Sequence, residues 1–278
     1  MQKDIHTFVI CAYGESPYIR ECIESIMSQS VKSRVLLTTS TPNEYLEGLC
    51  IEFGIDYHIR NASPSIGDDW NEAFRIAETE YVTIAHQDDI YEPEYTRKIL
   101  SGATGAKKYT NKEPVIIFTD YYELVNGEKR SGGLNLNIKK TLLFPLRSIR
   151  LSDKKTIKRG SLRLGNSICC PSVTYNKTYI EKLMSEDGRS DIFSTDYKSN
   201  LDWDAWEWLS SKEGVFVYIP KLLISHRIHS NSETSSVIEE GKRTNEDLVM
   251  FSRFWPRGIA GILTKVYRLS EKSNNRAD

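Results

Sequence analysis

The first part of the chain alternates short apolar runs with helical patterns, and this alternation constrains the fold more than any other feature of the sequence. Residues 7–12, 35–38, 55–60 and 81–85 have the composition of buried strands, and a helical pattern lies between each neighbouring pair. Strand–helix–strand units of this kind build a parallel sheet with helices on its faces. The sequence therefore predicts an α/β fold with a Rossmann-like, mostly parallel central sheet flanked by helices.

Capping residues mark the expected helix boundaries in this region. Pro17 opens the first helix, whose apolar residues recur at helical spacing. Thr41 and Glu44 are expected to cap the second helix reciprocally, and Gly54 ends it. Asp69 precedes the third helix and is expected to be its N-cap.

The pattern loosens beyond residue 104. A strand that ends in Asp120 is followed by an Asn126-Gly127 hairpin signal, and the basic stretch 139–163 is predicted to be a long loop. The other expected elements are a strand at 168–175, a helix at 202–212, two short strands around Pro220 and a helical segment at 239–278.

Composition excludes several classes of protein. The 278 residues include 37 basic and 38 acidic side chains, so the chain has no general attraction for nucleic acid. No apolar run reaches the roughly 18 residues of a membrane-spanning helix, and the apolar stretch at the N-terminus is too short for a signal peptide. The five cysteines are odd in number and lack CxxC spacing. We therefore expect a cytoplasmic protein with reduced core cysteines and no nucleic-acid partner.

Two adjacent acids follow the fourth expected strand. Asp88 and Asp89 stand at its carboxyl end, the edge where open α/β sheets bind ligands. Adjacent carboxylates repel each other, so their placement here favours a cation. A solvated acidic helix start before Pro93 explains the same pair without a ligand.

An acidic and aromatic cluster occupies residues 201–208. On a helix, Asp202 and Trp206 share one face while Asp204 points away, which would present a carboxylate beside an aromatic platform for a sugar ring. Alternatively, Asp202 is an N-cap and the tryptophans are core residues. Composition does not separate the two interpretations.

A third cluster follows the last expected strand. Strand alternation sends His226 to one side, and Arg227 and His229 to the other, where His229 could join a metal held by carboxylates. No cysteine or third histidine lies at a spacing that supports zinc. Oxygen-rich surroundings favour Mg²⁺ or Mn²⁺ instead.

Over residues 5–235 the chain resembles the family 2 inverting glycosyltransferases, which have the GT-A fold. The resemblance rests on five motifs in the family's order: FVICAYGESPYIRECIESIMSQS, NASPSIGDDWNEAFRIAETEYVTIAHQDDIYEPEY, NSICCPSVTYNK, LDWDAWEWLS and VYIPKLLISHRIHSNSET. It implies a catalytic domain at 1–235, with a nucleotide-binding half at 1–120 and an acceptor-side half with its loops at 121–235. Residues 236–278 would be a C-terminal helical appendage.

The resemblance also implies roles for individual residues. The nucleotide would be bound by Ala12, Tyr13, Glu15, Gln87 and Asp88. We also expect Thr39, Ser40 and Asp69 to contact it, although the resemblance does not assign them this role. A divalent cation, Mn²⁺ or Mg²⁺, would be held by Asp88 and His229. Asp202 would be the general base. The acceptor side would include Trp203, Asp204 and Trp206.

The chain departs from the family pattern at several positions. His86 and Leu201 stand where many members have acids. The second strand runs into residues 38–41, Thr-Thr-Ser-Thr, in place of the family's acidic run that reads the nucleobase. The hydroxyl of Thr39 or Ser40 would then hydrogen-bond the nucleobase. Asp68 or Asp69 would supply the acidic side chain that the second strand lacks.

Together these features predict metal-dependent, inverting transfer of a sugar from a nucleotide donor, with a UDP-sugar expected. The acceptor would be a hydroxyl of a glycan or lipid-linked glycan in surface polysaccharide or lipopolysaccharide assembly. A nucleotide-binding pseudoenzyme of the same fold is the alternative. A sugar nucleotidyltransferase ranks lower, because residues 11–15 lack the Gly-rich loop with Arg or Lys that holds a triphosphate.

Positive charge is concentrated in residues 139–163 and in the last thirty residues. The first stretch could be a solvated loop or could meet a diphosphate or an anionic lipid headgroup. The apolar and basic residues of 251–272 fit a helix at a membrane interface or a helix packed on the enzyme's own body. One interpretation therefore places the protein peripherally at the inner face of the cell membrane.

Overall fold

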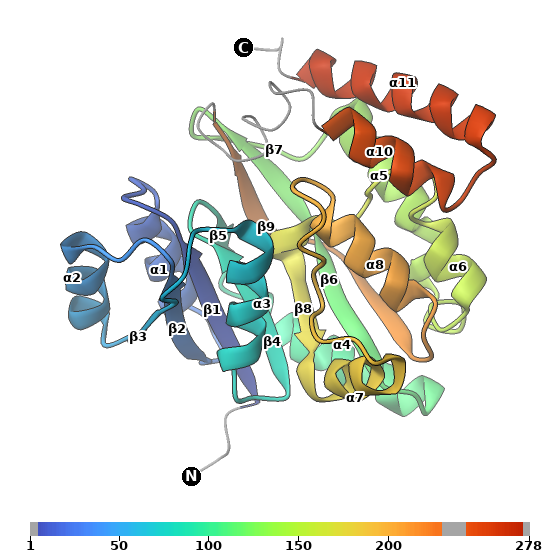
Figure 1. Cartoon of the computed structure of the whole chain (residues 1–278). Coiled ribbons are helices and arrows are strands. Elements are labelled where there is room, and N and C mark those ends of the chain that lie inside the picture. The colour runs from blue at the N-terminus through green and yellow to red at the C-terminus, as the bar shows by residue number, and fades with distance from the viewer. Residues whose placement is uncertain (1–4, 230–242, 275–278) are drawn as a thin grey trace.

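The computed structural model of the chain describes residues 5–229 and 243–274. Within these residues the strands form one twisted sheet (Figure 1). They are β1 (His6–Ala12), β2 (Arg34–Thr39), β3 (Asp56–Ile59), β4 (Tyr81–His86), β5 (Ile90–Tyr91), β6 (Pro114–Val125), β7 (Glu128–Arg130), β8 (Val173–Asn176) and β9 (Val215–Ile228). Their spatial order is β3-β2-β1-β4-β8-β6-β9-β5, and β7 pairs with β6.

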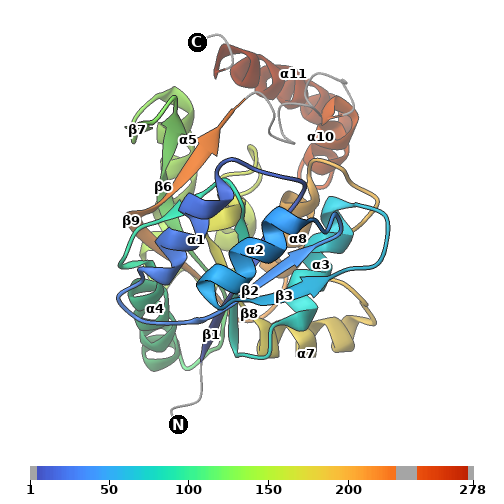
Figure 2. The same ribbon diagram turned by 90° about the vertical axis from the view of Figure 1, so that its left-hand side faces the viewer.

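Helices cover both faces of the sheet. One face packs against α1 (Ile19–Met27), α2 (Glu44–Phe53) and α4 (Tyr95–Thr110). The other packs against α3 (Ile66–Ile76), α7 (Lys177–Asp187) and α8 (Leu201–Ser210). The remaining helical elements are α5 (Leu134–Leu143), η1 (Phe144–Arg147), α6 (Lys155–Gly160), η2 (Cys170–Ser172), α10 (Arg243–Ser252) and α11 (Arg257–Asn274). Helices α10 and α11 stand at the end of the molecule opposite the N-terminus, as Figures 1 and 2 show.

The sheet is parallel in its first half. Strand β1 pairs in parallel with β2 and β4, and β2 pairs in parallel with β3. Strand β8 is antiparallel to both β4 and β6, and β6 then forms a long parallel ladder with β9. The predicted α/β fold with a helix-flanked central sheet is confirmed. The carboxyl ends of β1, β2 and β4 lie side by side, at the edge where such sheets bind ligands.

Several local features follow directly from the sequence. The expected apolar stripe of α1 is buried at Ile19, Cys22, Ile23 and Ile26. The β6–β7 hairpin turns at Asn126 and Gly127, whose φ angles of 50° and 83° are both positive, as a tight two-residue hairpin requires.

Two predicted helix caps are wrong by a few residues. The N-cap of α2 is Asn43, whose side chain accepts a hydrogen bond from the backbone N–H of Leu46, and not Thr41. The N-cap of α3 is Ser65. Asp69 consequently lies inside the first turns of α3, where its carboxylate is available for other contacts.

The later part of the chain is more regular than predicted. The stretch 139–163 contains the second half of α5, together with η1 and α6, and is not a long loop. Its Lys158 is fully buried and donates hydrogen bonds to the carbonyl oxygens of Lys212 and Gly214. Strand β9 continues through Pro220 as one strand, and β8 begins only at Val173.

The C-terminal helices pack closely on the body of the protein. Trp203 of α8 contacts the rings of Phe251 and Phe254 and the ring of Tyr267 in α11. The prediction of helices at 239–278 is confirmed for 243–274, and residues 230–242 lie outside the described part of the chain. Among the described helices, none combines the length and the apolar character needed to cross a bilayer.

Candidate functional site

Hydrogen bonds tie the ends of β1, β2 and β4 together. The side-chain oxygen of Gln87 accepts from the backbone N–H of Tyr13 at 3.0 Å, and its nitrogen donates to the Tyr13 carbonyl at 3.2 Å. Gly14, at a φ of 58°, donates its N–H to the Thr41 hydroxyl at 2.7 Å. Thr41 in turn lies 3.2 Å from the Thr39 hydroxyl. These contacts hold the backbone around the buried Ala12 in an open turn, with Tyr13 and Glu15 exposed beside it.

A carboxylate from α3 lies beside this turn. Asp69 accepts hydrogen bonds from Ser40 Oγ at 3.0 Å and from Arg60 Nε at 2.6 Å. The side chains come from the ends of β2 and β3 and from α3, so the contact fixes the rim of the sheet edge. The structure thus brings Ser40 and Asp69 together, whereas Asp68 is exposed on the same helix.

The first acid after β4 contacts the histidine that follows β9. Asp88 Oδ2 lies 3.1 Å from His229 Nε2, although the two residues are 141 positions apart in the sequence. The other oxygen of Asp88 accepts from Ser16 Oγ at 2.8 Å. Arg227 Nε donates to the Asp88 carbonyl at 3.0 Å. The expected alternation of β9 is therefore observed, because Arg227 and His229 both reach Asp88.

The second acid has a different partner. Asp89, with 1% of its surface exposed, lies 3.0 Å from His226 Nδ1 and accepts from the Arg227 N–H at 2.9 Å. Burial disfavours the charged form of both side chains. The attraction and the hydrogen bond between Asp89 and His226 outweigh burial, so the pKa of His226 is raised and the pKa of Asp89 is lowered. Within residues 5–229 and 243–274, Asp89 Oδ2 has no hydrogen-bond partner, and His86 Nδ1 lies 4.0 Å from it.

The Asp88–His229 pair fits one side of a divalent cation site. Ligands at right angles on an octahedral ion with bonds of about 2.1 Å lie about 3 Å apart, close to the 3.1 Å observed here. Within the described residues, no group of three or more His, Cys, Asp or Glu side chains could hold a metal. Two protein ligands suffice where a substrate diphosphate provides the others, which is the usual arrangement for Mg²⁺.

The proposed base lies at the first turn of α8. Asp202 is half-buried, and its two oxygens accept hydrogen bonds from Asn166 Nδ2 at 2.6 Å and from the Trp203 N–H at 2.7 Å. These contacts fix the side chain in one orientation. Asp202 is not the N-cap, because Asn200 occupies that position.

Two observations indicate that the start of α8 lies close to the edge formed by the carboxyl ends of β1, β2 and β4. A Cβ atom on Gly67, in the first turn of α3, would lie 2.8 Å from Leu201 Cδ2, so the two helices approach as closely as glycine permits. Burial raises the pKa of Cys169, and the charges of Asp89 and Asp202 both raise it further. This thiol therefore lies within electrostatic reach of both Asp89 and Asp202.

The three residues expected on the acceptor side are buried in the interior of the protein. Trp203 and Trp206 have 0% exposed surface and pack in the core, so neither offers a face to a sugar ring. Asp204 is also buried and forms ion pairs with Arg189 and Arg253. The interpretation of the tryptophans as core residues is the one that the structure supports.

Sequence reasoning missed several residues that hold this site together. They are Ser16, Arg60, Asn166 and Arg227, each of which binds a candidate functional carboxylate or its backbone. The pairing of His226 with Asp89 was also missed, although the alternation of β9 separates His226 from His229. Asn166 is the first residue of the motif NSICCPSVTYNK, but nothing in the sequence indicates its contact with Asp202.

Comparisons with known proteins address the family and the fold. Residues 7–108 match the family model described as "Glycosyl transferase family 2". This segment is therefore similar to the family 2 glycosyltransferases. The matched segment contains β1 to β4 and therefore the edge that gathers Tyr13, Gln87 and Asp88. No curated protein matches the sequence significantly.

Solved structures show that the chain has the GT-A fold over most of its length. S. aureus TarS residues 1–349 in complex with UDP-GlcNAc align with a TM-score of 0.56 and 14% identity, over 91% of this chain and 72% of that one. The mannosyltransferase PcManGT from Pyrobaculum calidifontis, in complex with GDP-Man and Mn²⁺, aligns with a TM-score of 0.57 and 13% identity, over 96% and 70%. The longer TarS structure has a TM-score of 0.56 at 15% identity, and this chain spans only 42% of its length.

Proposed function

We propose that this chain is a family 2 glycosyltransferase, a metal-dependent, inverting enzyme that transfers a sugar from a nucleotide donor to an acceptor hydroxyl. The observation that carries the proposal is the contact of Asp88 with His229 at the end of β4. It lies at the same edge as the turn formed by Tyr13 and Gln87. We expect a UDP-sugar donor, because the relatives of this fold include one bound to UDP-GlcNAc. The second relative binds GDP-Man, so the choice of base is part of the proposal.

The donor would lie along the edge formed by β1, β2 and β4. The nucleoside would lie against the turn at Ala12 and Tyr13, with Ser40 and Asp69 on the adjacent rim and the buried Thr39 next to Ser40 in the chain. Asp69 is held by Arg60, so its position does not depend on the ligand. The diphosphate would then reach Asp88, where Ser16 keeps the carboxylate in place.

Asp88 and His229 would hold a divalent cation, Mn²⁺ or Mg²⁺, against this diphosphate. Such an ion neutralises the charge that develops on the leaving group. Asp202 would accept the proton of the acceptor hydroxyl, a role that contributes typically about 10² to 10⁴-fold. Inversion requires a single in-line attack, so one positioned carboxylate is sufficient. Asn166 keeps one oxygen of Asp202 in a fixed orientation toward this task.

A nucleotide-binding protein without catalytic activity is the alternative, because His86 and Leu201 replace acids that are common in the family. Titrating the protein with UDP, with and without Mn²⁺, measures binding. An assay of donor hydrolysis with the same protein measures turnover. Binding with turnover supports the proposal, and tight binding of UDP with no hydrolysis or transfer by the wild type would favour the alternative.

We further propose that the acceptor is a growing surface glycan or a lipid-linked glycan, and that α11 brings the enzyme to an anionic membrane. One face of α11 packs on the body, and the other exposes Ile259, Ile262 and Val266, with 64% of Ile262 accessible. Residues 257–268 carry three basic side chains and no acidic one. An exposed apolar stripe beside cations is typical of helices that bind anionic bilayers.

Sedimentation with vesicles of anionic or neutral lipid tests this assignment. We expect the wild type to bind anionic vesicles at low salt, and Ile262→Glu to reduce binding several-fold. The control is Ile51→Glu, which places the same charge on α2 at a residue that is 76% exposed. Equal loss of binding in both variants, or no binding by the wild type, would contradict a role for α11.

A further inference from the structure

Helix α10 and the residue that follows it direct three charged side chains toward the segment that leads into α8. They are Glu246, Asp247 and Arg253, and all three contact residues 197–207. Residues 243–274 lie outside the segment that matches the family model, so the sequence motifs assign no catalytic role to this helix. The contacts nevertheless surround the first turn of α8, which carries the candidate base.

Glu246 holds three consecutive backbone amides. Its carboxylate accepts from the N–H groups of Lys198, Ser199 and Asn200 at 2.9, 2.9 and 3.1 Å, and from Ser199 Oγ at 2.7 Å. Burial opposes the charge of Glu246, but these donors outweigh it and lower the pKa of the side chain. A charged acceptor shared by three successive amides fixes the path of the backbone just before the helix.

Asp247 secures the residue at which α8 begins. It has 1% exposed surface and accepts from Asn200 Nδ2 at 2.9 Å. Asn200 is the N-cap of α8, and its side chain does not cap the helix in the usual way. Its carbonyl accepts the first helical hydrogen bond, from Asp204 N at 2.9 Å. The orientation of the first turn is therefore linked to α10.

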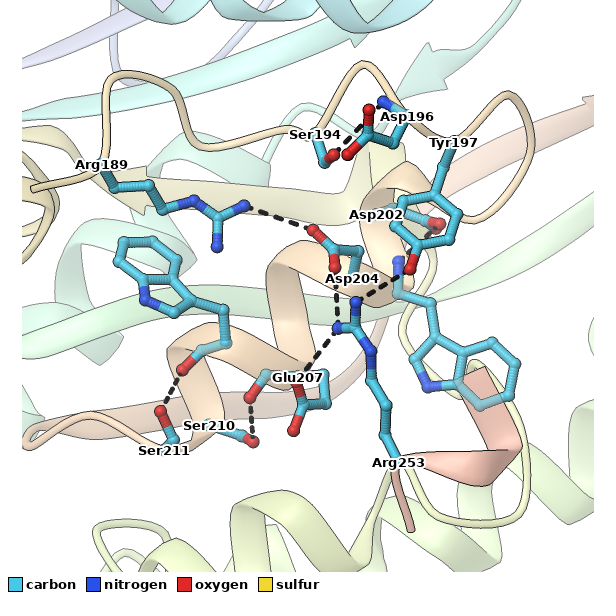
Figure 3. A network of polar contacts seen from close by, with 12 residues as sticks. Arg189, Ser194, Asp196, Tyr197, Asp202, Asp204, Glu207, Ser210, Ser211 and Arg253 are labelled. Carbon is cyan, nitrogen blue, oxygen red and sulfur yellow. Dashed lines mark hydrogen bonds and ion pairs between the residues drawn. The ribbon is translucent and has the colours of Figure 1, made fainter. Parts of the chain in front are cut away.

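Arg253, the residue after α10, contacts the same turn, as Figure 3 shows. Its guanidinium lies 2.7 Å from Asp204 Oδ1 and 3.2 Å from Glu207 Oε2, and donates to the Tyr197 hydroxyl at 2.8 Å. Asp204 is almost fully buried, so this pair is shielded from solvent. Arg253 thus joins the loop before α8 to its first two turns.

We infer that α10 is a positioning element for catalysis, and that Glu246 is the residue through which it holds Asp202 in place. This inference rests on the proposed function, because it takes Asp202 as the base. Asp202 is two residues beyond Asn200, whose N–H Glu246 binds and whose side chain Asp247 holds. Asn166 also holds the Asp202 carboxylate, through a hydrogen bond of 2.6 Å. A displacement of about 1 Å in a catalytic group can cost roughly a hundredfold in rate, so this double anchoring matters for transfer.

The competing explanation is that Glu246 only stabilises the fold. A double-mutant cycle separates the two, because residues that act through one another have non-additive effects. The variants are Glu246→Ala, Asp202→Asn and the two combined, with Glu246→Gln as the conservative change. Val249→Ala is the control, since Val249 is a largely exposed residue of the same helix.

Each variant is assayed for transfer by release of nucleoside diphosphate, for donor binding by calorimetry and for thermal unfolding. We expect Glu246→Ala to lower kcat about tenfold or more with donor affinity unchanged, and Glu246→Gln to recover part of the rate. In the Asp202→Asn background, Glu246→Ala should have little further effect. Effects that multiply in the double variant, or a loss confined to the unfolding temperature, would overturn the inference.

Amide hydrogen exchange provides a readout that does not depend on activity. Exchange at residues 198–203 should rise in Glu246→Ala and stay unchanged in Val249→Ala. Unchanged exchange in Glu246→Ala would overturn the inference whatever the kinetics. Failure of the proposed function would instead appear as a wild type without turnover, so the two failures are distinguishable.

Discussion

Replacing Asp202 by Asn removes the carboxylate that we assign as the base while preserving the shape of the side chain. The two carboxylate oxygens accept from Asn166 Nδ2 at 2.6 Å and from the Trp203 N–H at 2.7 Å. An Asn side chain has a single oxygen, so one of these hydrogen bonds is lost and an N–H₂ group faces a donor. Losing a hydrogen bond to a charged group costs about 1.5 to 3 kcal/mol of folding stability. We therefore expect the unfolding temperature to fall by about 3 to 10 °C.

The effect on catalysis should be larger than the effect on folding. Loss of a general base lowers turnover by typically about 10² to 10⁴-fold, which corresponds to about 2.7 to 5.4 kcal/mol in the barrier. Donor and metal affinity should be unchanged, because Asp202 is expected to act on the acceptor. Release of nucleoside diphosphate measures turnover, and calorimetry measures donor binding, both at a temperature where the variant is folded.

The control for this variant is Asp196→Asn, which neutralises an exposed acid in the segment just before α8. It should retain wild-type turnover. Near-normal turnover in Asp202→Asn would refute the assignment of the base. A weakened donor affinity with unchanged kcat would likewise place Asp202 in binding instead of proton transfer.

Three further predictions test other parts of the site. Asp88→Ala should weaken nucleotide binding in the presence of Mn²⁺ and leave it unchanged in EDTA; equal weakening in both would contradict a bridging ion. Gly67→Val should lower unfolding stability by about 1 to 3 kcal/mol and reduce transfer more than donor binding, since the new side chain displaces Leu201; a stable, fully active variant would contradict the close approach. The raised pKa of His226 means that the stability from its pair with Asp89 is full at about pH 5 and is lost as the pH rises through that pKa. Unfolding titrations of the wild type and His226→Gln should therefore converge at alkaline pH, and a pH-independent difference would refute this.

Features governed by local periodicity could be predicted from the sequence. The buried stripe of α1 and the hairpin at Asn126 follow from side-chain spacing and turn chemistry alone. The convergence of Asp88 and His229 could also be expected, because both follow strands and the alternation of β9 sends His229 toward the acidic edge. What the sequence lacked was the order of the strands, which depends on pairings between distant segments.

Contacts that depend on tertiary packing could not be predicted. Asp69 carries the residue type of an N-cap, yet Ser65 takes that role and Arg60 binds the free carboxylate. The spacing of the tryptophans in α8 is compatible with an aromatic platform for a sugar ring. In the structure, Trp203 is instead buried against Phe251 of α10 and Tyr267 of α11. The apolar residues of the basic stretch 139–163 lack clear periodicity, so its sequence predicts a loop. The structure buries one of its basic side chains, Lys158, inside the protein.

The most direct test of the central claim is a panel of sugar nucleotides, each incubated with the wild type, Mn²⁺ and a set of glycan acceptors. Released nucleoside diphosphate is measured for each donor. We predict that nucleoside diphosphate is released from a single class of donor, with a UDP-sugar preferred. This release should be lost in EDTA. Absence of release from every donor, despite measurable nucleotide binding, would contradict the assignment of this chain as an active glycosyltransferase.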